Sequence, residues 1–201
     1  ASRFALEQLA SLVCDQGLSG KVIRALHGEL CNRFARGKTF GTSTTLVAAY
    51  LTETGISIVN VGDSWAYLIS SLGLWTVLSR DHTVLNELIE TAEADSATEY
   101  ASIYSALTYC LVADHEEDQF AIHHSQAQFS HGDSLLLCSD GVHDTLGDAR
   151  LMSLFDPSLD SQQQVEIWRK AVLRAGAPDN FSIILTRNMS DCCLNREEAL
   201  L

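Results

Sequence analysis

The stretch LLLCSDGVHDTL, residues 135–146, runs from four apolar residues through Ser139 into Asp140 and Gly141, and Asp144 follows. An apolar run of this length between turn residues predicts a buried strand, which we expect at 134–139. Carboxylates are costly to bury unless they are paired, hydrogen-bonded or bound to a cation. The stretch therefore predicts a core strand that ends at a candidate metal site.

Two further motifs place an aspartate beside an apolar run. They are VGDS (61–64), with Asp63, and APDNFSII (177–184), with Asp179 and Asn180. Mg²⁺ and Mn²⁺ prefer oxygen ligands, often carboxylates from distant parts of a chain. We expect none of the three motifs to be a helix, and we expect the Gly after Asp140 to permit a tight turn. Asp-Gly and Gly-Asp pairs are also common in ordinary turns, so pattern alone leaves a metal site and simple turns both open.

The composition limits the function classes. The 201 residues are 46% hydrophobic, and 13 basic against 26 acidic side chains give a formal net charge of −13. This balance argues against a nucleic-acid-binding surface and against adhesion to anionic membranes. The length and the hydrophobic content predict one domain over residues 1–187, followed by a polar tail over 188–201.

The six cysteines indicate a reducing compartment. They are irregularly spaced, no CxxC occurs, and Cys31, Cys110 and Cys138 lie within apolar runs, where a thiol acts as a small hydrophobic group. We find no signal peptide and no apolar stretch long enough to cross a bilayer. The sequence therefore predicts a cytoplasmic protein.

Hydrophobic spacing predicts helices near the start and the end of the chain. Apolar residues recur with helical spacing over 4–13, over 22–34 after a candidate N-cap at Ser19, over 83–112, and over 161–175. The inner face of the last helix is expected to carry four residues: Val165, Trp168, Val172 and Ala175.

Short β-branched or aromatic runs predict strands between these helices. They lie at 44–51, 56–62, 65–70, 74–79, 120–129, 134–139 and 181–187. The close spacing of the first four indicates an antiparallel meander, because parallel strands need long crossovers. We expect the last strand to be buried, and the fold class to be α+β.

The motifs together resemble a known family. GTSTTLVAAYL, ISIVNVGDSWAYL, LSRDHT, GDSLLLCSDGVHDTL and APDNFSIILTR, in this order, resemble the metal-dependent serine/threonine protein phosphatases of the 2C type, the PPM family. The resemblance covers roughly residues 4–187. It implies an α-β-β-α sandwich of two antiparallel sheets flanked by helices, with two or three Mn²⁺ or Mg²⁺ ions at one end.

The resemblance also implies roles for individual residues. Asp140 and Asp179 match metal ligands, and Asp63 matches a residue that helps to hold a third ion. Asp144 then lies in the outer shell of the site, as do Gly141 and Asn180. The remaining matched pair, Asp81 and His82, opens the flap that shapes substrate access. The implied reaction is metal-assisted hydrolysis of phosphoserine and phosphothreonine on proteins by water, without an enzyme nucleophile or any assignable catalytic side chain.

Part of the family pattern has no match between Ala1 and Gly41. Family members carry an N-terminal NED strand and a second strand ending in DGMGGH, which supply further metal ligands. We therefore expect the N-terminal strands of the fold to be missing from this sequence. Three interpretations remain open. The chain is an active phosphatase whose partners are phosphoproteins of a serine/threonine kinase pathway, a catalytically inactive relative that acts as a regulatory or protein-binding module, or a half whose missing strands another chain supplies. Trp65, where the family often has Arg, is expected to pack within its strand rather than to contact a partner.

Overall fold

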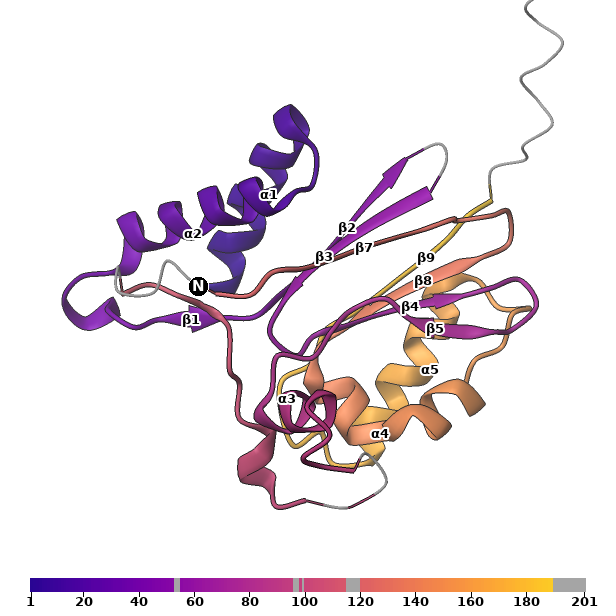
Figure 1. The fold of residues 1–201 in the computed structure, drawn as a ribbon. Coiled ribbons are helices and arrows are strands. Elements are labelled where there is room, and N and C mark those ends of the chain that lie inside the picture. Colours follow the sequence, from indigo (N-terminus) through magenta and orange to yellow (C-terminus); the bar gives the residue numbers. More distant parts are fainter. Residues whose placement is uncertain (53–54, 96–97, 99, 115–119, 190–201) are drawn as a thin grey trace, which may run out of the picture.

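A computed structural model describes residues 1–52, 55–95, 98, 100–114 and 120–189. Its strands form a three-stranded sheet of order β2-β3-β7 and a four-stranded sheet of order β5-β4-β8-β9, with a short β1-β6 pair beside them. Every strand pairing is antiparallel. The expected α+β class with antiparallel sheets is confirmed (Figure 1).

Two helices cover the outer face of the three-stranded sheet. They are α1 (Ser2–Gln16) and α2 (Gly20–Phe34), and the sheet contains β2 (Leu46–Thr52), β3 (Gly55–Val61) and β7 (His123–Ala127). Leu26 and Leu30 of α2 pack in one cluster with Val59 and Val61 of β3. Figure 1 shows this helix pair in indigo over its sheet. The expected helices over 4–13 and 22–34 and the first two expected strands are therefore confirmed.

Two helices cover the face of the four-stranded sheet that points away from the three-stranded sheet. Its strands are β4 (Trp65–Ile69), β5 (Trp75–Val77), β8 (Ser134–Cys138) and β9 (Ile183–Arg187), and its helices are α4 (Asp140–Ser153) and α5 (Ser161–Arg174). Leu136 of β8 packs in one cluster with Val142 of α4 and Trp168 of α5. Figure 1 shows these helices in orange and yellow, on the opposite side from α1 and α2.

A third apolar cluster lies between the two sheets. Ile56 and Ile58 of β3 meet Leu135 and Leu137 of β8 there. Side chains alternate between the faces of a strand, so β8 sends Leu135 and Leu137 to this cluster and Leu136 to the helices. A strand covered on both faces reads as a continuous apolar run, which is why the sequence LLLC does not alternate.

Four sequence predictions of local structure were wrong. The expected meander is broken, because β3 and β4 belong to different sheets and the chain changes sheet at the turn between them. Residues 140–153 form α4, so the SDG motif opens a helix, with a kink at Gly147. β9 lies at the edge of its sheet, with Ile184 60% exposed, and Ala175 is exposed just after α5.

The expected long helical region over 83–112 is also wrong. Its described residues contain only α3 (Val84–Glu90), the 3₁₀ turn η2 (Ser102–Ser105) and β6 (Leu111–Val112). β6 pairs with β1 (Ser43–Thr44), which follows the 3₁₀ turn η1 (Gly37–Thr39). None of the helices in the described part of the chain combines the length and the apolar composition needed to cross a bilayer.

Candidate functional site

The three strands β4, β8 and β9 bring the predicted acidic residues to one end of their sheet. Trp65 pairs with Cys138, and Cys138 pairs with Ile183, so these three residues form one row across the sheet. Just outside this row the chain carries Asp63 before β4, Asp140 after β8 and Asp179 before β9. The antiparallel order therefore places three carboxylates from distant segments at the same sheet end.

Asp140 and Asp179 line one pocket of about 160 Å³, together with Gly141, Asp144, Thr145 and Pro178. Each of the two carboxylates accepts a hydrogen bond from the amide that follows it, Gly141 N at 2.8 Å and Asn180 N at 2.6 Å. Asp140 lies in the first turn of α4, where the helix dipole favours a negative charge. The central sequence expectation, that these two acids converge, agrees with this geometry.

The loop before β9 is held tightly against the start of α4. Ser139 N donates to Ser182 O at 3.2 Å, and Ser182 N donates to Ser139 Oγ at 3.0 Å. A Cβ on Gly141 would lie 2.4 Å from the backbone oxygen of Asn180. Gly141 is therefore needed for close approach of two backbones, and not for the tight turn that the sequence suggested.

Asp63 occupies the turn through which the chain passes from one sheet to the other. Gly62 precedes it with φ at +103°, and a Cβ there would lie 2.4 Å from Cγ2 of Thr45. Burial and the charge of Asp140 raise the pKa of the Asp63 carboxyl. The mutual repulsion of Asp63 and Asp140 in a partly buried place is the situation that a bound cation would relieve.

His143 joins two of these acids, and sequence reasoning assigned it no role. Its Nε2 lies 3.0 Å from the Asp63 carbonyl oxygen and its Nδ1 lies 3.0 Å from Asp144 Oδ1. Burial lowers the pKa of His143, but the hydrogen bonds to Asp144 and Asp63 and the nearby negative charges together outweigh it, and the net pKa is raised. Both ring nitrogens face acceptors, as an imidazolium requires. Its position between Asp140 and Asp144 in the sequence was the available signal.

Trp65 links the Asp81 segment to the same site. Its indole Nε1 donates to Asp81 Oδ1, and its ring stacks on His143 with centroids 4.6 Å apart. Burial raises the pKa of Asp81 to about 6. Trp65 therefore packs within the protein, as expected, and holds the Asp81 carboxylate near Asp63 and Asp144.

His82 supports the Asp63 turn from behind. Its Nδ1 accepts a hydrogen bond from Gly62 N at 3.0 Å, and its ring packs edge-on against Tyr109. Burial and the nearby Arg80 lower the pKa of His82 to about 4. A neutral imidazole that accepts at Nδ1 is the form that this hydrogen bond needs.

The donor set fits a hard divalent cation in kind. Carboxylate oxygens suit Mg²⁺ and Mn²⁺, and Asp140 and Asp179 share a pocket. Within the part of the chain that the structure describes, no three His, Cys, Asp or Glu side chains come close enough to hold one ion. Mg²⁺ is commonly bound by only one or two carboxylates, with water and substrate phosphate completing its shell, so a pair of acids is compatible with such an ion.

Comparison with known families assigns the chain. The family described as Protein phosphatase 2C matches residues 6–175, which include Asp63, Asp81, Asp140 and Asp144. The chain belongs to the protein phosphatase 2C family. The matched range ends before Asp179, so the place of that residue in the site rests on the packing of its loop against α4.

Two relatives that are named serine/threonine phosphatases are each 29% identical to the chain. The serine/threonine phosphatase stp of Listeria innocua matches over 150 residues, 74% of this chain and 58% of its own length. The serine/threonine protein phosphatase PstP of Mycobacterium tuberculosis matches over 154 residues, 72% of this chain and 27% of its own length. The chain thus spans little more than half of the Listeria relative.

Solved structures share the fold. PstP/Ppp of Mycobacterium tuberculosis superposes with a TM-score of 0.82 at 21% identity, covering 94% of this chain and 81% of that one. Stp1 of Staphylococcus aureus gives 0.77 at 22% identity, covering 93% and 76%. The catalytic domain of PstP in complex with two manganese ions gives 0.70 at 22% identity, covering 92% and 78%.

Proposed function

We propose that this chain carries out metal-dependent hydrolysis of phosphoserine and phosphothreonine on proteins. The observation that carries the proposal is that Asp140 and Asp179, 39 positions apart in the sequence, line one pocket in a chain of the protein phosphatase 2C family. The relatives named as serine/threonine phosphatases support the same reaction. The layer order, helices, two sheets, helices, supports the proposal, because the resemblance to the PPM family implies the same order.

Asp140 and Asp179 are the side chains that would hold Mn²⁺ or Mg²⁺, with Asp63 beside them for a further ion. Two or three such ions are proposed for the complete site, and two manganese ions in the PstP catalytic domain support this. When bound, such ions lower the pKa of a water molecule and neutralise charge on the phosphoryl oxygens.

The surrounding residues position these ligands. Asp144 holds His143, and His143 binds the backbone of Asp63, so the Asp63 turn is fixed from the α4 side. Gly141 and Asn180 seat the Asp179 loop on α4. Asp81 and His82 are proposed to shape access to the phosphate. Hydrogen bonds from Trp65 to Asp81 and from Gly62 to His82 hold both residues near the acidic site.

The proposal extends to the substrates and partners of the chain. We propose phosphorylated proteins of a serine/threonine kinase pathway as substrates, in the cytoplasm. We also propose that residues 1–187 act as one phosphatase domain. Of the expected polar tail, 188–201, residues 190–201 lie outside the described part of the chain.

The experiment compares Asp140→Asn with a matched control, Glu29→Gln, an exposed acid on α2. Mn²⁺-dependent phosphate release from a phosphothreonine peptide is measured together with Mn²⁺ binding by calorimetry. We expect Asp140→Asn to lower both by about 100-fold or more, since even partners of metal ligands contribute 10–100-fold, and Glu29→Gln to change neither.

The same measurements test the inactive alternative. Mn²⁺ binding that depends on Asp140 without any phosphate release would favour a regulatory or protein-binding module. Absence of both, with no difference between Asp140→Asn and the parent chain, would overturn the metal site itself.

A further inference from the structure

A second cavity lies at the other end of the four-stranded sheet. Its volume is about 680 Å³, and its walls come from the β4–β5 hairpin, the turn before β8, the end of α4 and the end of β9. β8 runs from Ser134 near this cavity to Cys138 near Asp140. Four residue steps at about 3.4 Å each separate the two ends by roughly 14 Å, so this cavity is distinct from the acidic pocket.

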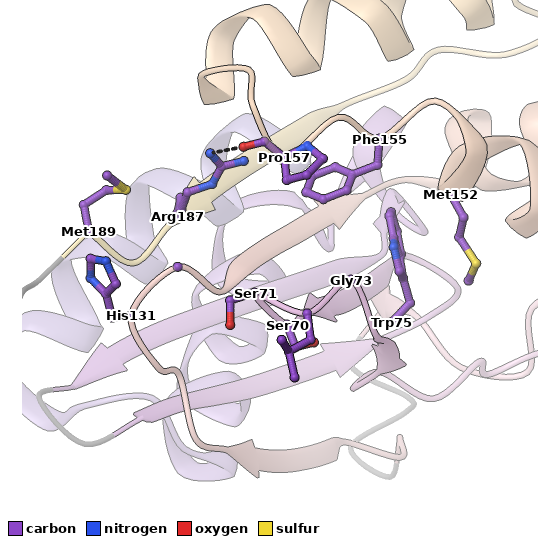
Figure 2. Close-up of a pocket in the computed structure, with 12 residues that line it drawn as sticks. Ser70, Ser71, Gly73, Trp75, His131, Met152, Phe155, Pro157, Arg187 and Met189 are labelled. Carbon is purple, nitrogen blue, oxygen red and sulfur yellow. Dashed lines mark hydrogen bonds between the residues drawn. The ribbon is translucent and has the colours of Figure 1, made fainter.

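The cavity has one basic end and one apolar end. Figure 2 shows Arg187 and His131 gathered with Met189 on one side, and Trp75, Phe155 and Met152 on the other. The rings of Trp75 and Phe155 meet edge to face with centroids 5.7 Å apart. None of the described lining residues is acidic, although the chain as a whole has a net charge of −13.

Arg187 is a fixed cation, and the contacts that hold it within the described residues are all to neutral groups. Its Nε donates to Ser134 Oγ at 3.2 Å, and its Nη1 donates to Pro157 O at 3.0 Å, as Figure 2 shows, and to Leu159 O at 3.2 Å. These acceptors are neutral, and no ion pair joins Arg187 to a described carboxylate. Among the described residues, its buried Nη2 has no hydrogen-bond partner. A partly buried guanidinium in this state favours an anion.

Two described carboxylates are adjacent in sequence to lining residues of the cavity, and both already accept hydrogen bonds from neighbouring groups. Asp133 accepts hydrogen bonds from Ser71 N and Ser130 N, both at 2.8 Å. Asp156 accepts from both the amide and the hydroxyl of Ser158. These carboxylates brace the loops around the cavity, and Arg187 remains as a cation in its lining.

We propose that this cavity binds a small organic oxyanion with a flat apolar body, such as an aromatic carboxylate. The oxyanion takes the place of a counter-ion beside Arg187, and the ring lies against Trp75 and Phe155. The volume lies within the 300–1,000 Å³ typical of small-molecule sites, which combine apolar walls with a few placed polar groups. The proposal concerns a second site and does not depend on phosphatase activity.

The test is calorimetric titration of the whole chain with 2-naphthoate and with its uncharged analogue 2-naphthamide. We expect 2-naphthoate to bind about tenfold more tightly, as one charge-assisted contact allows, and to shift the NMR signal of the Trp75 indole. 2-Naphthylphosphonate forms a parallel arm: tighter binding of the carboxylate or of the phosphonate identifies which oxyanion the site prefers, and either result supports the proposal.

Three variants keep the test decisive. Arg187→Gln is expected to abolish the preference for the anion, whereas Arg174→Gln, an exposed arginine at the end of α5, leaves it unchanged. Because Arg187 also holds the loop between α4 and α5 against β8, Met152→Trp is the second variant. It fills the apolar end without touching Arg187 and is expected to remove binding of all three ligands. Equal affinity for naphthoate and naphthamide, or anion binding that survives Met152→Trp, would overturn the proposal.

Discussion

The two ends of the four-stranded sheet share the same strands and carry opposite charge. At one end Asp63, Asp140 and Asp179 follow or precede β4, β8 and β9. At the other end the cavity is lined by Arg187 and His131 and by no described acidic residue. The apolar strands set the fold, and the few residues just outside them decide what each end can bind.

The two ends also differ in how they are held. At the acidic end two backbones touch at Gly141 and Asn180, and two hydrogen bonds between Ser139 and Ser182 join the neighbouring segments. At the basic end side chains also join the loops, with Arg187 reaching two carbonyl groups and Asp133 reaching two amides. Backbone contact leaves little room for adjustment, so we expect substitutions to be costlier at the acidic end.

Asp179→Asn tests the acidic end most directly. We expect it to weaken Mn²⁺ binding and phosphate release by about 100-fold, as for Asp140→Asn. Because both acids serve one site, the double variant should lose little more than either single variant. Calorimetry and peptide dephosphorylation check this. Fully multiplicative losses in the double variant would show that the two carboxylates act at separate sites.

Gly141→Ala tests the backbone contact behind that pair of acids. The added Cβ would lie 2.4 Å from the Asn180 oxygen, and backbone atoms cannot move aside cheaply. We expect a loss of about 2–4 kcal/mol in the free energy of unfolding. Gly28→Ala is the matched control, because nothing lies within 4 Å of its Cβ on α2. That control should gain about 0.5–1 kcal/mol. Urea denaturation of both variants makes the comparison, and an equal effect of the two would contradict it.

The sequence predicted the parts of the fold that depend on local pattern. The run LLLC marked a core strand because β8 is covered on both faces, and the motif order placed Asp140 and Asp179 at strand ends. The change of sheet at Gly62 was not predictable from spacing, because a tight turn and a crossover between sheets look alike in a sequence. The helical period in 83–112 arose from apolar residues that lie in separate short elements.

At the site, the sequence identified the acids and missed what holds them. His143 carries no signal beyond its place between Asp140 and Asp144, and its role follows from a carbonyl 80 positions away at Asp63. Gly141 looked like a turn residue, yet its use depends on how closely Asn180 approaches. Such contacts depend on tertiary packing and cannot be inferred from one segment at a time.

Asp81→Asn tests the negative charge of the acidic end as a function of pH. Burial raises the pKa of Asp81 to about 6 in the folded chain, above the unfolded value. The folded chain therefore favours the protonated carboxyl. The stability of the fold is unaffected by Asp81 below about pH 4, where the group is protonated in both states, and it falls as the pH rises through about 6 and the buried group must ionise. Without metal, Asp81→Asn should stabilise the chain by about 1–2 kcal/mol at pH 8 and by nothing at pH 3.5. Denaturation curves with a chelator present test this, and a pH-independent difference would refute it.

Leu72→Ser tests the tolerance expected at the basic end. Leu72 lies at the tip of the β4–β5 hairpin and is 95% exposed, although it lines the rim of the cavity. Since it contributes almost no burial, its loss should change the free energy of unfolding by less than about 0.5 kcal/mol. It should also leave the tenfold preference for 2-naphthoate intact, because that preference arises from Arg187 and not from the rim. A large loss of stability would mean that the hairpin tip is packed, and the contrast between the two sheet ends would then fail.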